Sequence, residues 1–315
     1  MDQLRAMRVF SRVIDAGGFA KAANALDIAP AVATRLVAEL EEHLGARLIN
    51  RTTRRLALTD VGEEYLERVR SILSEVDDAE AVASIATAEA RGRLCVLVPP
   101  GFAVHQLAKH LPRFRALHPK VSLELTVSAS VEAPDENHDV TIIVQRVKPI
   151  EGAFIARRIA TAEVVLCATP EYLDQHGRPK HPRDLANHDT LIPIPASEQR
   201  ELTFRPAWGG GDPEVVELKK LPPLMTTHSD TLYAAALAGM GIAGLPSMIC
   251  EDALMEQALE RVLPQWHMQT LTLFAAMPTR KHVPMRTRAF VDFLLDTFGR
   301  SERDPWLAAA GCESC

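Results

Sequence analysis

The sequence has few cysteines, and they follow no pattern that would build a disulfide framework. Its five cysteines are an odd number spread over 315 residues, whereas disulfide-rich domains carry even numbers in short chains. Cys95, Cys167 and Cys250 lie in apolar runs, where a free cysteine usually packs as a small hydrophobic side chain. Cys312 and Cys315 form a C-x-x-C pair without a second pair of ligands nearby, so we expect no metal site there.

A long uninterrupted hydrophobic run is also missing. Residues 231–250 form an uncharged stretch as long as a membrane span, but three glycines and Pro246 interrupt it. We therefore expect a buried helix, a turn and a strand there, and no membrane contact. The first ten residues, MDQLRAMRVF, carry charges and lack the apolar core of a signal peptide, which predicts a cytoplasmic protein.

Motifs of common catalytic sites are absent as well. The sequence has no H-E-x-x-H, no G-x-S-x-G, no phosphate-binding loop and no dinucleotide fingerprint. His228, Ser229 and Asp230 are consecutive, so their side chains diverge and cannot form a proton relay. We expect no enzymatic activity and no cofactor. A metabolite-processing enzyme and a solute-binding protein are the alternatives, the second without the export signal that it would need.

An overall positive charge is the last missing feature, since 35 Lys and Arg residues face 41 Asp and Glu residues. DNA binding would therefore require a local patch. Residues 1–55, with nine basic and six acidic side chains, provide one.

This basic segment predicts three helices. Apolar residues recur at helical spacing over 4–14 and 19–26, with Gly17 and Gly18 between them. Pro30 suits the first position of a third helix, which Gly45 ends. The apolar stripe of this helix consists of Ala33, Leu36, Val37, Leu40 and Leu44. A short helix, a tight turn and a longer helix form the helix-turn-helix pattern, whose second helix enters the major groove of DNA.

A β-hairpin is predicted next, over residues 47–58 (RLINRTTRRLAL). Two β-prone runs flank Thr52 and Thr53, and the segment contains four arginines and no acid. This combination is typical of a wing beside a phosphate backbone. A solvated hairpin with chance arginines is the alternative.

A long helix follows the hairpin, capped by Thr59 and Asp60. Apolar residues recur at alternating spacings of four and three from Tyr65 to Ala90, which is a heptad seam. Such a helix needs a partner, and we expect a second copy of the chain. The predicted dimer contact consists of Tyr65, Val69, Ile72, Val76, Ala79, Ala83 and Ala86. Packing of the seam on the chain's own next domain is the alternative.

Beyond Arg91 and Gly92 the pattern alternates between strands and helices. Strands are predicted at 93–98, 121–127, 140–144, 163–168 and 271–277, and helices at 102–118, 231–239 and 285–298. This order favours an open α/β domain.

The first 65 residues resemble the DNA-binding region of LysR-type transcriptional regulators. The resemblance is carried by Phe10, Gly18-Phe19, Ala22-Ala23, Leu26, Thr34-Arg35, Leu40-Glu41, Leu44-Gly45, Leu48, Arg51-Thr52, Arg54, Leu58-Thr59 and Gly62. Residues 93–298 are similar, more loosely, to the effector domain of the same family, notably in the runs HDVTII (138–143) and DTLYAAALAGMGIAGLPS (230–247).

The resemblance implies a winged helix-turn-helix domain at 1–58, a linker and dimerisation helix at 59–91, and an effector-binding domain at 92–300. That domain would have two lobes, like type 2 periplasmic binding proteins: lobe I at about 92–160 and 266–300, and lobe II at about 161–265. Residues 301–315 would be a tail. The resemblance also implies homodimers, often tetramers, that bind promoter DNA and respond to a small-molecule effector.

One departure from the family concerns the start of the recognition helix. Where the family commonly has Ser-Gln, this chain has Ala29-Pro30, which removes a capping hydroxyl and an amide able to read a base edge. The predicted DNA contacts are Pro30, Ala31, Thr34, Arg35 and Ala38 on the helix, and Arg51, Thr52, Arg54 and Arg55 on the wing.

A ligand of a two-lobed α/β domain lies beyond the carboxyl ends of its strands. The predicted effector-binding residues at these ends are Pro100, Gly101, Phe102, Ser128, Ser130, Gln145, Arg146, Thr227, His228 and Ser229. Hydroxyls, positive charge and a helix N-terminus favour a carboxylate, so we expect a small organic acid. A neutral effector is the alternative.

Overall fold

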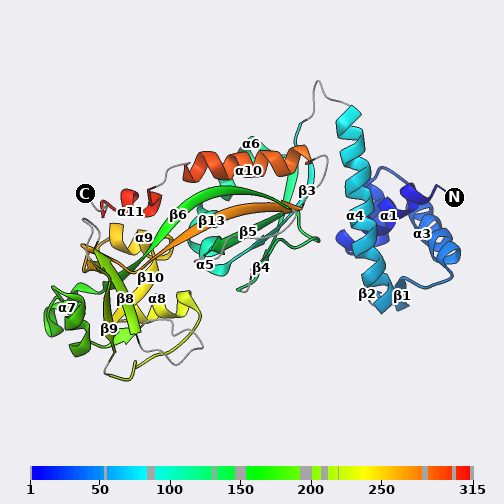
Figure 1. Cartoon of the computed structure of the whole chain (residues 1–315). Helices are drawn as coiled ribbons and strands as arrows, with labels where there is room; N and C mark the ends of the chain where they lie inside the picture. The colour runs from blue at the N-terminus through cyan, green and yellow to red at the C-terminus, as the bar shows by residue number, and fades with distance from the viewer. Residues whose placement is uncertain are drawn as a thin grey trace. The chain divides into compact units, whose positions relative to one another are not determined.

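The computed structural model describes residues 2–52, 55–83, 89–129, 131, 133–145, 154–191, 201–206, 212–218, 220–278, 283–299 and 303–312. The chain divides into two compact units, Met1–Glu89 and Ala90–Cys315 (Figure 1). Each unit has its own hydrophobic core.

The first unit begins with the predicted three helices, α1 (Gln3–Asp15), α2 (Phe19–Ala25) and α3 (Pro30–Leu44). As predicted, α3 starts at Pro30 and ends at Gly45, which has a φ of 66°. Phe10, Val37 and Leu40 are fully buried where these helices meet. The expected stripe on α1 is wrong at Leu4, which is exposed. Because α1 contacts α2, α3 and α4, it buries a broader face that lies to one side of Leu4.

The predicted wing is present as an antiparallel pair of strands, β1 (Ile49–Thr52) and β2 (Arg55–Leu58). The predicted long helix follows as α4 (Asp60–Ala83). Thr59 caps it, since the Thr59 hydroxyl oxygen accepts from the Gly62 N–H at 2.9 Å. Ala90 was expected at the end of this helix, but it is buried in the second unit.

The second unit contains one large sheet in the order β4-β3-β5-β13-β6-β10-β7, with β11 also paired to β6. Its strands are β3 (Gly92–Val98), β4 (Val121–Val127), β5 (Val140–Gln145), β6 (Phe154–Ala168), β7 (Thr190–Leu191), β10 (Ile242–Pro246), β11 (Glu260–Val262) and β13 (Gln269–Pro278). A small sheet is formed by β8 (Glu201–Pro206), β9 (Glu214–Glu217) and β12 (Trp266–His267).

Two lobes share the large sheet, because the long antiparallel strands β6 and β13 run side by side from one lobe into the other (Figure 1). The helical segments of the first lobe are α5 (Pro100–Phe102), the π-helical turn η1 (Ala103–Leu107), α6 (Ala108–Leu117) and α10 (Met285–Phe298). Those of the second lobe are α7 (Pro170–His176), the 3-10 helix η2 (Pro182–Asn187), α8 (Ser229–Leu237), α9 (Ser247–Met255) and α11 (Pro305–Ala309). The expected lobe boundary at 160/161 falls inside β6, and β12, expected in lobe I, pairs with β8 of the second lobe.

The predicted strands and helices of this unit are present, but β6 starts nine residues before the predicted 163. Residues 155–158 are exposed, so hydrophobicity alone does not reveal the first half of this strand. The uncharged run 231–250 contains a helix and a strand, α8 and β10, as expected, although α8 is only partly buried. The start of α9 at Ser247 was not predicted. Among the helices of the described ranges, none is long and apolar enough to cross a membrane.

The expected tail is wrong for residues 304–312, which belong to the fold. Trp306 and Leu307 of α11 are buried. Asp304 caps α11 by accepting from the N–H of Leu307 at 3.1 Å, and it also accepts from the Ser247 hydroxyl at 2.6 Å. Cys312 is a partly buried free thiol, whereas Cys315 lies outside the described residues.

Candidate nucleic-acid interface and effector cleft

The recognition helix α3 presents one exposed face opposite its buried stripe. The five predicted contact residues, Pro30, Ala31, Thr34, Arg35 and Ala38, are all exposed and lie on this face. The Thr34 hydroxyl donates to the Pro30 carbonyl at 3.0 Å, which uses its proton within the helix. The Arg35 side chain is 68% exposed and lies 3.7 Å from Glu39. No side chain caps the helix at Ala29.

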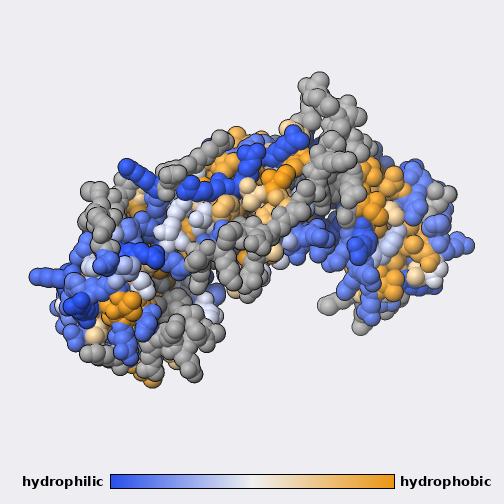
Figure 2. All heavy atoms as spheres, in the orientation of Figure 1, coloured by the Kyte–Doolittle hydropathy of each residue, from blue (hydrophilic) through white to orange (hydrophobic). Residues whose placement is uncertain are grey.

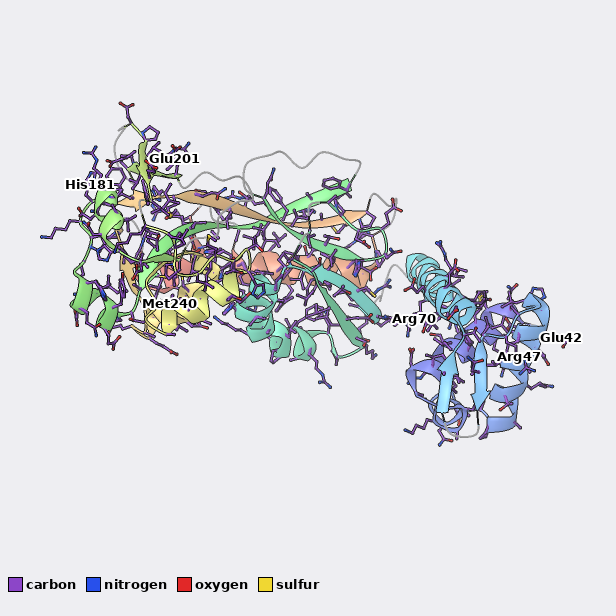
Figure 3. All side chains as sticks on the ribbon, turned by 90° about the horizontal axis from the view of Figure 1, so that it is seen from below. Glu42, Arg47, Arg70, His181, Glu201 and Met240 are labelled. Atoms are coloured by element: carbon purple, nitrogen blue, oxygen red, sulfur yellow. The ribbon has the colours of Figure 1, made fainter. Side chains whose placement is uncertain are left out.

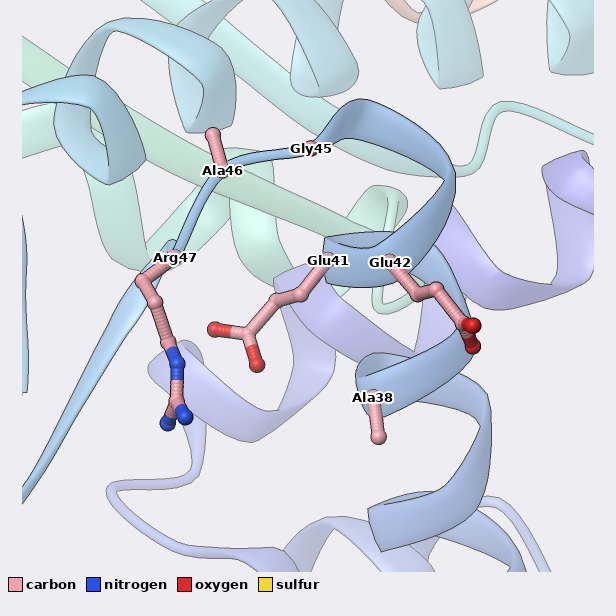
Figure 4. A pocket seen from close by; sticks show the side chains of 6 residues that line it. All are labelled: Ala38, Glu41, Glu42, Gly45, Ala46 and Arg47. Carbon is pink, nitrogen blue, oxygen red and sulfur yellow. The ribbon is translucent and has the colours of Figure 1, made fainter.

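The end of α3 and the start of the wing are held together by a buried carboxylate. Glu41 Oε1 accepts from the backbone N–H groups of Leu48 at 2.8 Å and Ile49 at 3.0 Å. A hollow of about 400 Å³ lies at this junction, lined by Ala38, Glu41, Glu42, Gly45, Ala46 and Arg47 (Figure 4). Figure 3 shows Glu42 and Arg47 at the same end of the first unit. Sequence reasoning missed Glu41, although an acid on the buried side of a helix is a signal that it has a hydrogen-bond partner.

The wing residues are described only in part. Arg51, Thr52 and Arg55 occupy strand positions, with Thr52 paired opposite Arg55. Arg54 lies outside the described residues. The hairpin therefore places its described arginines on the strands that follow the α3 junction.

The first positions of the heptad seam pack inside the first unit. The rings of Tyr65 and Phe10 lie 6.0 Å apart, and Val69 is fully buried. Arg70 pairs with Asp15 of α1 at 2.6 Å. The assignment of Val69 to the dimer contact is therefore wrong, because its side chain is already fully buried within one chain. Tyr65 is half-buried, and its place in the dimer contact stays a prediction.

The seam positions after Val69 are less buried within the chain. Ile72 is 40% exposed and Val76 is half-buried. Ala79 and Ala83 belong to α4, and Ala86 lies outside the described residues. Figure 2 shows apolar residues at the surface of the first unit; exposed members on α4 include Val61 and Ile72.

Some predicted effector residues lie at the surface and others in the core. Thr227 and His228 are exposed; Pro100, Ser128, Gln145 and Ser229 are half-buried. Phe102 is fully inaccessible and packs on Phe298 at 5.2 Å between ring centres. A Cβ at Gly101 would lie 2.7 Å from the Ile249 side chain of α9. Gly101 and Phe102 therefore serve packing, which corrects their assignment to the ligand. Ser130 and Arg146 lie outside the described residues.

Polar contacts that the sequence did not predict join the two lobes beside these residues. His105 of η1 lies 2.7 Å from Asp230 of α8 through Nε2 and Oδ1. The amide of Gln106, a buried residue, donates to the Met248 carbonyl at 2.7 Å and to Glu251 at 2.9 Å. π-Helical turns often occur at functional positions, and here the turn carries both lobe-bridging residues.

A lysine extends this interlobe contact. Lys109 Nζ lies 2.6 Å from Asp252 and 3.1 Å from Glu251 of α9. Partial burial opposes the charged form, but the hydrogen bonds to these two carboxylates raise the pKa of Lys109 above its ordinary value. The lysine therefore stays protonated at neutral pH. In the described part of the chain no cluster of three or more histidine, cysteine or acidic side chains is arranged to hold a metal.

Two family models cover nearly the whole chain. Residues 4–63 match the bacterial regulatory helix-turn-helix proteins of the lysR family, and residues 87–299 match the LysR substrate binding domain. The chain is 32% identical over 288 residues to an uncharacterized HTH-type transcriptional regulator of Haemophilus influenzae, covering 91% of this chain and 97% of that protein.

Further similar proteins are also transcriptional regulators. An HTH-type transcriptional repressor of Pseudomonas aeruginosa is 32% identical over 302 residues, 96% of this chain and 94% of its own length. The structure of CrgA, a LysR-type transcriptional regulator from Neisseria meningitidis, superposes with a TM-score of 0.58 at 28% identity, covering 94% of this chain and 99% of that one. The chain belongs to the LysR family: it is a DNA-binding transcriptional regulator with an effector-binding domain, and it is not an enzyme.

Proposed function

We propose that this regulator reads promoter DNA with the exposed face of α3 while its wing contacts the phosphate backbone. The observation that carries the proposal is the common face of Pro30, Ala31, Thr34, Arg35 and Ala38, opposite the buried stripe of the same helix. Arg35 reads a guanine edge in this proposal, since arginine is the commonest partner of that base. Wing residues Arg51, Thr52, Arg54 and Arg55 would contact phosphates. The protein would bind chromosomal DNA in the cytoplasm.

The protein would act as a homodimer joined through the second half of α4. Support comes from Ile72 and Val76, apolar residues four positions apart in the heptad seam, which lie after Tyr65 and Val69 along α4. Ala79, Ala83 and Ala86 continue the seam, and small side chains allow two helices to approach closely. Two such dimers would form the tetramer that is common in the family.

The effector would bind beside the ends of β4 and β5 and the start of α8, near Ser128, Gln145, Thr227, His228 and Ser229. A small organic acid is our choice because His105 and His228 flank Asp230 there, at 2.7 and 3.6 Å, and α8 presents its N-terminus. Pro100 lies at the end of β3, whereas Ser130 and Arg146 enter the proposal from the sequence alone.

Selection of bound duplexes from random DNA by the full-length protein tests the DNA-reading proposal. We expect an interrupted palindrome, and a pool with no enriched sequence would contradict it. A thermal-shift screen of matched acids, amides and neutral analogues tests the effector class. A ligand at 100 times its dissociation constant adds about 2.7 kcal/mol of stability. Equal stabilisation by an acid and its amide would contradict the carboxylate site.

A further inference from the structure

Residues 47–49, which lead from α3 into the wing, accept and donate hydrogen bonds on two sides. On one side Glu41 Oε1 accepts from Leu48 N–H and Ile49 N–H. On the other side, the Thr59 hydroxyl donates to the Arg47 carbonyl at 2.7 Å, and the Thr59 N–H donates to the Leu48 carbonyl at 3.0 Å. The segment therefore has hydrogen-bond partners both on the recognition helix and at the start of α4.

The packing around this segment leaves it little freedom. Leu48 and Ile49 are buried, and Glu41 itself is only 8% exposed. The first turn of α4 passes so close to the Leu48 carbonyl that a Cβ at Gly62 would overlap the carbonyl oxygen. Only Gly45, Ala46 and Arg47 connect the end of α3 to Leu48. Without Glu41, the two N–H groups would lose a charged acceptor in a buried place, where hydrogen bonds matter most.

We propose that Glu41 is a positioning residue for the wing: its carboxylate fixes the arginine-bearing hairpin relative to the recognition helix, so that both reach DNA together. The inference rests on the proposed DNA-binding mode. Thr59 completes the arrangement by joining the base of the wing to the first turn of α4. Ala33, Val37 and Leu40 of α3 are buried in the core of the first unit, so we expect α3 to keep its place, and with it base reading, when Glu41 is replaced.

The test uses full-length protein and a duplex enriched from random DNA by the wild type. Each phosphate that the protein no longer binds flattens the dependence of log K on log salt by about 0.9. We expect Glu41→Ala to flatten this slope by one or two such steps while the enriched sequence stays the same. Glu41→Gln keeps an oxygen that can accept both N–H groups, so we expect it to restore the wild-type slope.

A double variant that combines Glu41→Ala with Arg51→Ala tests whether Glu41 acts through the wing. A role of Glu41 in stability alone would leave the effect of Arg51→Ala on DNA affinity unchanged. If Glu41 acts through the wing, Arg51→Ala should lower affinity in the wild type but add little in the Glu41→Ala background. A folded Glu41→Ala protein with the wild-type slope, or with the full effect of Arg51→Ala, would overturn the proposal.

Glu41→Asp serves if Glu41→Ala does not fold, because the shorter side chain keeps the charge but withdraws the acceptor. Folded Glu41→Asp should show the same flattened slope, and a wild-type slope would overturn the proposal. If neither variant folds, Glu41→Gln decides: a wild-type slope supports the acceptor role and a flattened slope contradicts it. Failure of the wild type to enrich any sequence would instead contradict the proposed function.

Discussion

His105 and Asp230 are 125 positions apart in the sequence, yet their side chains meet at 2.7 Å between the two lobes of the second unit. The pair joins the helical segment after β3 to the first turn of α8. It lies next to Thr227, His228 and Ser229, the residues proposed to meet the effector. If the effector binds there as proposed, it would contact or displace this bridge.

Breaking this bridge should weaken the second unit. We expect His105→Ala and Asp230→Ala each to lower the free energy of unfolding by about 1.5–3 kcal/mol, as is usual for a hydrogen bond to a charged group. The double variant should lose less than the sum of the two, because both remove one interaction. Chemical denaturation of all four proteins measures the coupling, and strict additivity would show that the contact contributes nothing.

The wing arginines should act through phosphate and not through base sequence. Arg51→Ala combined with Arg54→Ala should weaken binding to selected and random duplexes alike, and flatten the salt slope by about 0.9 for each phosphate released. Fluorescence anisotropy at several salt concentrations measures both. Weakening confined to the selected duplex, with the slope unchanged, would assign these residues to base reading instead.

Arg35 should behave in the opposite way. Its side chain is largely exposed on the α3 face, so Arg35→Ala should relax preference at one or two base pairs by about 1–3 kcal/mol each. A selection that returns the wild-type consensus with Arg35→Ala would contradict the assignment.

Two positions on one helix should distinguish folding from dimerisation. Val69 is fully buried within one chain, whereas Ile72 is 40% exposed. A buried unpaired carboxylate is costly, so Val69→Asp should unfold the first unit, while Ile72→Asp should leave it folded but monomeric. Sedimentation and circular dichroism separate these outcomes. A wild-type oligomer in Ile72→Asp would place the dimer contact elsewhere.

The unfolding free energy of the second unit should depend on pH in the acid range because of Asp304. Burial raises the pKa of this carboxyl, although hydrogen bonds from Ser247 and three backbone N–H groups oppose the shift. The folded protein therefore binds the Asp304 proton more tightly than the unfolded chain does. Its contribution to stability is fully present below the ordinary aspartate pKa and declines as the pH rises through the raised value.

Asp304→Asn removes this titration. The difference in unfolding free energy, wild type minus variant, should therefore fall as the pH rises through the acid range. Urea denaturation at a series of pH values measures it. A difference that grows with pH would show that the hydrogen bonds outweigh burial.

Local periodicity determined much of this protein without reference to its tertiary structure. The stripe from Ala33 to Leu40, with Pro30 before it and Gly45 after it, is sufficient to define α3, because a helix buries the side that carries its apolar residues. That burial leaves Thr34 and Arg35 on the free face. The wing follows in the same way from two short β-prone runs, and the α/β order of the second unit follows from its alternating segments.

Only the tertiary structure decided which partner each apolar or polar residue meets. Tyr65, Val69 and Ile72 share one heptad seam, but Tyr65 contacts Phe10 of α1 and Val69 is fully buried, whereas Ile72 is exposed. Periodicity predicts that such residues are buried but does not say which surface covers them. His105, Gln106 and Glu41 look like ordinary polar residues in the sequence. Their roles arise because β6 and β13 carry the chain between the lobes and because the wing folds back on α3, which brings distant backbone and side-chain groups within hydrogen-bond distance.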